Sequence, residues 1–219
     1  MITLHHLDNS RSQRILWLLE ELELPYEIVI YRRDPVTRRA PESLKAVHPL
    51  GKSPVITDGG VVVAESGAII EYLTRGHGDG RLAVTDPNAP DFASYLHWLH
   101  YAEGSAVTPM LFELYLRLLG GGNETLQATV NAQITQQLSY IDGALIKREF
   151  FVGSRFTAAD IQMTFVLEFA QASGSLGGYP RLEDYVRRMH ARPAYIRSVE
   201  KGGEYSLGSF GQRQVPGTG

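Results

Sequence analysis

The apolar pattern of this chain changes at one place, the segment 76–90. Three glycines and two prolines fall in that segment: Gly76, Gly78, Gly80, Pro87 and Pro90. Such a cluster is typical of a linker. Before it, short alternating stretches predict strands as well as helices, and after it only helical periodicity is found. The 219 residues therefore predict an α/β unit followed by an all-helical unit, with boundaries at 1–76, 77–89 and 90–201 and a Gly-rich tail at 202–219.

The first unit is expected to have the order β-α-β-α-β-β-α. Alternating or β-branched residues predict strands at 2–6, 26–31, 55–57 and 61–63. Helices are expected to begin at Ser12, Pro41 and Glu65. In the first of these helices the apolar residues recur at helical spacing and Pro25 closes the segment, so Glu20, Glu21 and Glu23 are expected to lie mostly outside.

The second unit is predicted from helical periodicity alone. Helices are expected at 91–119, 125–146, 157–173 and 180–191, and Pro193 forces a break before a short last helix. Gly104 and Pro109 interrupt the first of these. Thr157 and Asp160 fit a capping box at the start of the third, which we assign to folding rather than to catalysis.

The sequence contains no cysteine. Disulfides, cysteine-bound metals and a cysteine nucleophile are therefore excluded, and the thiol of any thiol chemistry must come with the substrate. The seven histidines form no metal-ligand pattern, so no metal site is expected. A net charge of -3 gives no basic field for nucleic acid or membranes. No signal peptide or membrane span is apparent, and a cytoplasmic location is expected.

A polar cluster, Asn9-Ser10-Arg11-Ser12, lies where a strand is expected to end and a helix to begin. A helix N-terminus exposes unpaired N–H groups and favours a bound anion such as a thiolate. A hydroxyl there can donate one more hydrogen bond, which lowers the pKa of the thiol. The same residues also fit a purely structural interpretation, in which Ser10 or Ser12 caps the helix.

Two further segments combine charge with exposed backbone. In Gly51-Lys52-Ser53-Pro54-Val55, a cis bond before Pro54 would turn the Ser53 backbone outward for a peptide ligand. Taken alone, however, this segment favours an ordinary turn with a solvated lysine. At Glu65-Ser66, a hydroxyl and helix amides can hold a carboxylate while Glu65 binds an ammonium group. Simple helix capping is the alternative there.

The order of these motifs resembles the cytosolic glutathione transferases. The stretch from Leu4 to Leu22 is similar to the bacterial and fungal branch with a serine-type or atypical first loop, and Phe151-Val152-Gly153 precedes the capping box as in that family's second domain. The resemblance covers nearly the whole chain up to about residue 200. It implies a thioredoxin-like first domain followed by the all-helical C-terminal domain of that family.

The resemblance also implies where glutathione is held. Glu65 and Ser66 are implied to hold its γ-glutamyl end, and Ser53 to pair through its backbone with the cysteinyl unit beside a cis Pro54. Lys52 is implied to face the glycine carboxylate, together with Arg38 or Arg39. Glutathione is then a co-substrate, and no further cofactor is implied.

The catalytic hydroxyl has two candidates in the first loop. The family's active serine falls on Asn9 or, one step along, on Ser10; we favour Ser10 as the donor to the thiolate, with Asn9 as the alternative or as an amide partner. Tyr101 and Met110 are candidates to line an apolar pocket for the electrophile.

The function implied is conjugation of glutathione to an apolar electrophile by a detoxifying homodimer. Two alternatives stay open. Some bacterial members with an amide in the first loop act as glutathione-dependent peroxidases or disulfide reductases, and a protein with this fold can also bind glutathione without useful turnover. Loops and helix faces build the pocket of the electrophile, so the tertiary fold decides which electrophile it takes.

Overall fold

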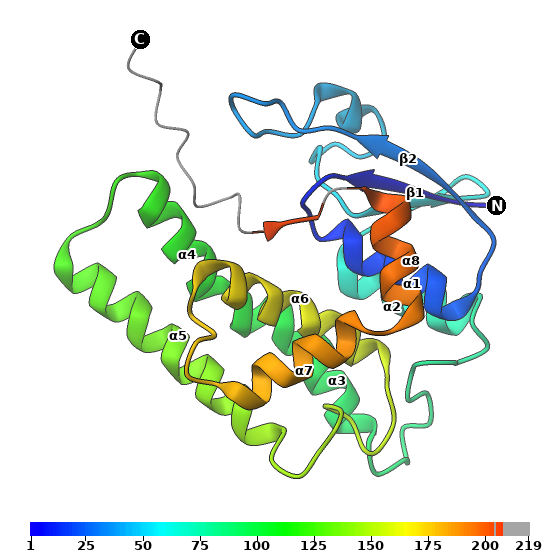
Figure 1. The fold of residues 1–219 in the computed structure, drawn as a ribbon. Coiled ribbons are helices and arrows are strands. Elements are labelled where there is room, and N and C mark those ends of the chain that lie inside the picture. The colour runs from blue at the N-terminus through cyan, green and yellow to red at the C-terminus, as the bar shows by residue number, and fades with distance from the viewer. Residues whose placement is uncertain (204, 208–219) are drawn as a thin grey trace.

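The computed structural model describes residues 1–203 and 205–207 and has an α/β layer joined to a helical layer (Figure 1). The first layer contains four strands, two α-helices and one short 3-10 helix. In chain order they are β1 (Ile2–Leu7), α1 (Ser12–Leu22), β2 (Tyr26–Tyr31), η1 (Glu42–Ala46), β3 (Val55–Asp58), β4 (Val61–Ala64) and α2 (Ser66–Gly76). The predicted β-α-β-α-β-β-α order is therefore confirmed, with the second helix being of the 3-10 type.

The sheet has the order β2-β1-β3-β4. β1 pairs parallel with β2, whereas β3 runs antiparallel to β1 and to β4. Val55 at the start of β3 consequently lies opposite both His5, near the end of β1, and Ala64, at the end of β4. This register gathers the β1–α1 loop, the residues before β3 and the start of α2 at one end of the sheet. We call this end, where β1 finishes and β3 starts, the sheet edge.

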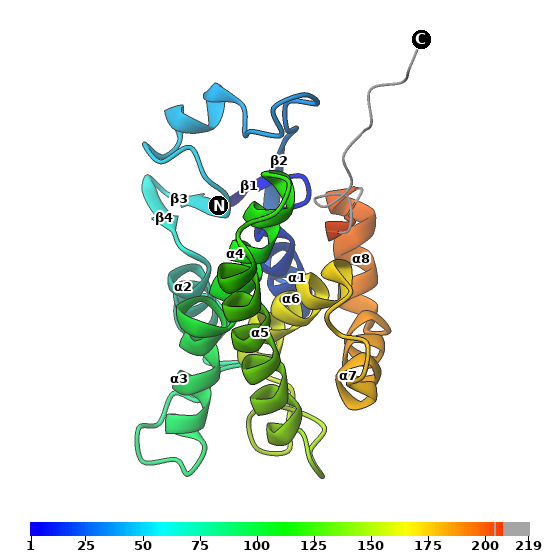
Figure 2. The ribbon, with the colours of Figure 1, turned by 90° about the vertical axis from the view of Figure 1, so that its left-hand side faces the viewer.

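The second layer contains only helices. They are α3 (Phe92–Tyr101), the π-helical segment η2 (Ala102–Ala106), α4 (Val107–Leu118), α5 (Glu124–Ala144), α6 (Ala158–Ser173), α7 (Pro180–His190) and α8 (Pro193–Gly202). Figure 2 shows α3, α4 and α5 forming a long hairpin, with α6 behind it. The helix predicted over 91–119 is a π-interrupted α3–α4 run, because the segment around Gly104 widens to π geometry. Within the described residues, no helix is long and apolar enough to cross a membrane.

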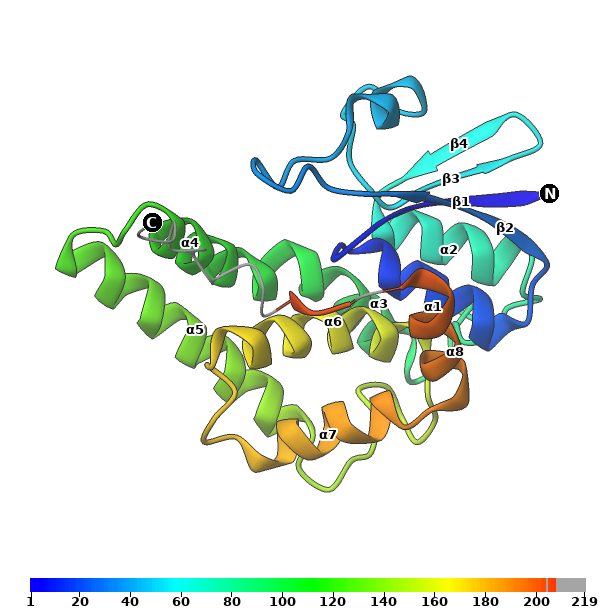
Figure 3. The same ribbon diagram turned by 45° about the horizontal axis from the view of Figure 1, so that its top comes forward.

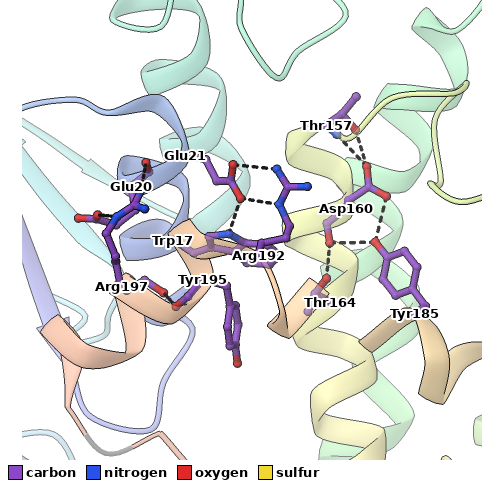
Figure 4. A network of polar contacts seen from close by, with 11 residues as sticks. Trp17, Glu20, Glu21, Thr157, Asp160, Thr164, Tyr185, Arg192, Tyr195 and Arg197 are labelled. Atoms are coloured by element: carbon purple, nitrogen blue, oxygen red, sulfur yellow. Dashed lines mark hydrogen bonds and ion pairs between the residues drawn. The ribbon is translucent and has the colours of Figure 1, made fainter. Parts of the chain in front are cut away.

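Helix α1 is buried on all sides, which corrects one expectation. Glu20 is only 6% exposed, where the periodicity predicted an outside position. The reason is α8, which packs along α1 and brings cations to it: Glu20 pairs with Arg197 at 2.9 Å and with Lys201 at 2.5 Å. Glu21 is half-buried and pairs with Arg192 at 2.6 Å (Figure 4).

Asp160 ties the start of α6 to two other segments (Figure 4). Its buried carboxylate accepts hydrogen bonds from the Thr157 backbone and hydroxyl at 2.8 and 3.1 Å. It also accepts from the Phe151 N–H at 3.0 Å and the Tyr185 hydroxyl at 2.9 Å. The predicted capping box is present, and the additional donors make it the junction of α6, α7 and the loop before α6.

The described part of the tail, residues 205–207, crosses the helical layer. It lies between α6 and the β1–α1 loop (Figure 3). Tyr205 donates a hydrogen bond to Glu168 of α6 at 2.6 Å, and Leu207 is buried. We call residues 205–207 the strap. The remainder of the predicted tail, Glu204 and 208–219, lies outside the described residues.

Glu103 joins the two layers from the π-helical segment. Its carboxylate lies 3.0 Å from Arg11 Nε and 2.8 Å from Nη2 of the buried Arg14. Arg14 also donates to Gln162 of α6 at 2.6 Å and stacks on Phe165, with its Cζ 4.0 Å from the ring centre. Burial raises the pKa of Glu103, but the two arginines outweigh burial, so the pKa lies below its usual value.

This lowered pKa predicts a pH-dependent contribution to stability. Because the folded-state pKa of Glu103 is depressed, the contribution is present above the unfolded value near 4.5 and is lost as the pH falls through the folded value. We expect Glu103→Gln to lower the free energy of unfolding by about 1 kcal/mol at neutral pH. Urea denaturation should show the two proteins converging in acid; a difference that stays constant with pH would exclude this ion pair as its source.

Candidate glutathione site

Three segments meet at the sheet edge where β1 ends and β3 begins. They are the β1–α1 loop (8–11), residues 52–54 and the Glu65–Ser66 pair. The Ser53–Pro54 bond is cis, as the family resemblance implied. The Ser53 hydroxyl donates to the His5 carbonyl at 2.8 Å, which fixes this segment against the end of β1.

Asn9 has a left-handed backbone, with φ at 46°, and a buried side chain. Its Oδ1 accepts a hydrogen bond from the Ser206 backbone N–H at 2.6 Å. A backbone N–H can only donate, so this contact identifies which side-chain atom is the oxygen and directs the Nδ2 amide elsewhere. Within residues 1–203 and 205–207, no group accepts a hydrogen bond from Asn9 Nδ2. Among the described residues, both N–H donors of this amide are therefore without an acceptor.

Ser10 belongs to a buried chain of polar groups. Its Oγ lies 2.8 Å from Ser12 Oγ and accepts from the Ser12 N–H at 3.1 Å. Ser12 Oγ in turn lies 3.0 Å from His6 Nδ1 and accepts from the Leu7 N–H at 3.2 Å. All three side chains are less than 9% exposed. Ser10 thus turns back toward the start of α1, in agreement with the capping interpretation.

The direction of the protons in this chain follows from His6. Burial lowers its pKa to about 4, so the ring is neutral near pH 7 and carries one N–H. The ring also makes a hydrogen bond to the Gly202 backbone, and we assign the proton to that nitrogen, Nε2. His6 Nδ1 is then an acceptor, and the single Ser12 proton is donated to it or to the Leu7 carbonyl, 3.2 Å from Ser12 Oγ. In either case Ser12 Oγ accepts from Ser10. In this arrangement the Ser10 hydroxyl proton points inward and its outer side is an acceptor.

The start of α2 carries an unsatisfied polar atom. Glu65 is exposed and has φ at 73°, which turns the chain sharply into the helix. Ser66 is 3% exposed, and its Oγ has no hydrogen-bond partner among the residues that the structure describes. A buried hydroxyl without a partner costs about 1–3 kcal/mol. Together with the free N–H groups of the 11-residue helix α2, it forms a place for a carboxylate.

The basic candidates lie at the surface. Lys52 and Arg39 are both exposed, so either side chain can reach toward an anion near Ser53. Sequence reasoning missed Arg33, which fixes the first loop: its Nε donates to the Asp8 carbonyl at 3.0 Å and its Nη2 to the Asn9 carbonyl at 3.3 Å. The run of basic residues at 32–39 gave no signal that separates Arg33 from its neighbours.

The two candidates for the electrophile pocket lie in different surroundings. Met110 is buried and lines a small cavity with Phe169 and Leu207. Tyr101 instead donates a hydrogen bond to Gln137 of α5 and packs among aromatic rings. Tyr101 does not belong to the described lining of the Met110 cavity, so the structure does not bring these two residues together.

The described part of the chain contains no candidate metal site. No group of three or more histidine, aspartate or glutamate side chains within residues 1–203 and 205–207 could hold an ion. The chemistry of the edge is instead that of anion and peptide binding. It offers a hydroxyl at a helix N-terminus and an amide in the first loop, both without a partner among the residues described, and a strand-like backbone at Ser53.

Comparison with known proteins agrees with this geometry. Residues 10–75 match the family model of the glutathione S-transferase N-terminal domain, and residues 92–193 match that of the C-terminal domain. Glutathione S-transferase 3 of Schizosaccharomyces pombe is 36% identical, with 96% of this chain and 91% of the relative covered. Glutathione S-transferase 1 of Saccharomyces cerevisiae is 31% identical, with 92% and 95% covered.

Solved structures give the same result. A glutathione S-transferase from Actinobacillus pleuropneumoniae superposes with a TM-score of 0.87 at 35% identity, covering 94% of this chain and 95% of that one. A sphingomonad glutathione S-transferase in complex with glutathione, at 21% identity and a TM-score of 0.73, shares the fold over 92% of this chain and 98% of its own. The chain, with its thioredoxin-like first domain and helical second domain, belongs to the glutathione S-transferase family.

Proposed function

We propose that the sheet edge binds glutathione and holds its thiol as a thiolate for attack on an apolar electrophile. The observation that carries this proposal is the buried Ser66 hydroxyl, which has no hydrogen-bond partner within residues 1–203 and 205–207. A folded chain tolerates such an atom poorly, and a ligand carboxylate at the start of α2 would satisfy it.

The three parts of glutathione are proposed to bind to successive residues along the sheet edge. The γ-glutamyl carboxylate lies on Ser66 and the α2 amides, and its ammonium group lies near the exposed Glu65 carboxylate. The cysteinyl backbone pairs with Ser53, in the manner of a peptide added to a strand edge. Pro54 is buried and fixes that segment, while Lys52 and Arg39 supply positive charge for the glycine carboxylate.

Asn9 is the donor that we assign to the thiolate. Its Nδ2 has no acceptor among the described residues, whereas the Ser10 hydroxyl proton is directed to Ser12. A hydrogen bond to a charged partner is stronger than one to a neutral partner, so an amide beside the sulfur favours the thiolate over the thiol. Ser10 remains the alternative donor, because rotation of the two hydroxyls would point its proton outward.

The electrophile is proposed to enter from the side of the helical domain. Met110 lines the small cavity there, and the apolar part of its wall comes from Leu114, Phe169 and Leu207. The paired Glu113 and Arg117 also border the cavity. An apolar wall favours an uncharged aromatic or aliphatic electrophile. Tyr101 does not line this cavity, so its place at the electrophile site stays a prediction from the sequence. Assembly as a homodimer remains an expectation from the family.

Replacing Asn9 with Ala should lower kcat/KM for glutathione and chlorodinitrobenzene about tenfold, because one hydrogen bond to the thiolate is lost. Ser10→Ala is the matched comparison in the same loop and should lower it less. A larger loss in Ser10→Ala than in Asn9→Ala would transfer the donor role to Ser10.

Assays of the parent protein with other substrates distinguish the alternative activities. Assays with cumene hydroperoxide and a glutathione mixed disulfide should give lower turnover than chlorodinitrobenzene. Faster turnover of either would support a peroxidase or reductase, in which the Asn9 amide serves the same thiolate. Binding of glutathione without turnover on any of these substrates would identify a binding protein.

A further inference from the structure

We propose that the strap, residues 205–207, is a positioning element for the thiolate: the Ser206 backbone N–H orients the Asn9 amide toward the bound sulfur. This inference rests on the function proposed above, in which Asn9 is the donor. It assigns a role in the α/β site to a segment at the far end of the chain, 197 residues from Asn9.

The hydrogen bond between the strap and the first loop can run in only one direction. Ser206 N lies 2.6 Å from Asn9 Oδ1, and the N–H must be the donor. An asparagine amide that is free to flip would offer either its oxygen or its nitrogen to a neighbouring group. The Ser206 N–H removes that choice, because the flipped amide would set two donors against each other. Without this contact, the amide oxygen could face the thiolate and repel it.

The strap is itself held by the helical domain. The buried Glu168 of α6 accepts from Tyr205 at 2.6 Å, and it also accepts from Tyr195 at 2.7 Å. Leu207 is buried in the wall of the cavity that Met110 lines. The strap therefore has an anchor on each side of Ser206, and both anchors belong to the second domain.

The backbone of Asn9 is held separately, from the first domain. Arg33 donates to the Asn9 carbonyl at 3.3 Å, so loss of the strap contact leaves the loop in place and frees only the side chain. A change in the strap should consequently alter the ionisation of bound glutathione more than its affinity. A merely structural role of the strap would alter stability and leave the bound thiol unchanged.

The test removes the N–H with Ser206→Pro and measures the pKa of the thiol of bound glutathione from the ultraviolet absorbance of its thiolate. Ser206→Pro is compared with Ser206→Ala, since both variants lose the serine hydroxyl and only the proline lacks the N–H. We expect the pKa to be higher in Ser206→Pro by about one unit, that is, a tenfold lower ratio of thiolate to thiol at a given pH. The dissociation constant of glutathione should change much less.

The same pair is then made in the Asn9→Ala protein, where we expect proline and alanine at 206 to give equal thiol pKa values. A second variant, Tyr205→Phe, loosens the anchor without changing the backbone and should raise the pKa in the same direction by a smaller amount. Equal pKa values for Ser206→Pro and Ser206→Ala in the otherwise unchanged chain would overturn the inference. An equal effect of proline with and without Asn9 would do so too.

The Asn9→Ala protein distinguishes failure of the proposed donor from failure of the positioning role. If Asn9→Ala leaves the bound thiol unchanged, the donor assigned under the proposed function is wrong. If Asn9→Ala raises the thiol pKa and the strap variants do not, only the positioning role fails.

Discussion

Replacing Asp160 with Ala should lower the free energy of unfolding by about 4 kcal/mol, the largest effect that we expect from a single substitution. Four donors converge on this carboxylate: the N–H groups of Phe151 and Thr157 and the hydroxyls of Thr157 and Tyr185. Removing their common acceptor leaves several of them buried without a partner, and each such donor costs about 1–3 kcal/mol. Urea denaturation at neutral pH measures the loss.

The comparison variant is Asp160→Asn. It retains one acceptor oxygen but sets an NH₂ group against the remaining donors, so its stability should lie between those of the parent protein and Asp160→Ala. The folded fraction of either variant should retain its activity per molecule, because we assign Asp160 to folding. A stable Asp160→Ala protein without activity would contradict that assignment and indicate a role in the site.

Replacing Ser66 with Ala should weaken glutathione binding by between about tenfold and a hundredfold. The loss corresponds to one hydrogen bond to a carboxylate, about 1.5–3 kcal/mol. Because Ser66 Oγ makes no hydrogen bond to any described residue, its removal leaves no partner unsatisfied within them, and the free protein should be as stable as the parent or more so. Isothermal titration of glutathione measures the affinity, and thermal unfolding without glutathione measures the stability.

Ser139→Ala is the matched control for this result. Ser139 is an exposed serine on α5 whose hydroxyl lies 3.2 Å from the Tyr179 hydroxyl, in the helical domain rather than at the sheet edge. Its substitution should leave the affinity for glutathione unchanged. A Ser66→Ala protein with the parent affinity would show that the γ-glutamyl carboxylate lies elsewhere.

The order of elements could be predicted because it depends on local signals. Proline closes or opens several of the helices: Pro180 and Pro193 each stand at the first residue of a helix, where proline is tolerated. The capping box at Thr157 likewise depends on residues three positions apart. These features need no knowledge of the tertiary fold.

The contacts that shape the site could not be predicted, because they join residues distant in the sequence. The sequence pattern predicts Glu20 on the outer side of α1. In the folded chain α8 packs there and pairs Glu20 with Arg197 and Lys201. Ser206 donates a backbone N–H to Asn9, and a backbone group leaves no trace in a sequence pattern. The sequence alone favours Ser10 as the donor, because its inward hydrogen bonds depend on how His6 and Ser12 are arranged in space.

The most direct test of the whole account is a crystal structure of the protein with glutathione bound. We expect the γ-glutamyl carboxylate on Ser66 Oγ, the cysteinyl backbone paired with Ser53, and the sulfur within about 3.5 Å of Asn9 Nδ2. A sulfur that lies on Ser10 Oγ and away from Asn9 would contradict the assigned donor. A glutathione bound away from this sheet edge would contradict the account as a whole.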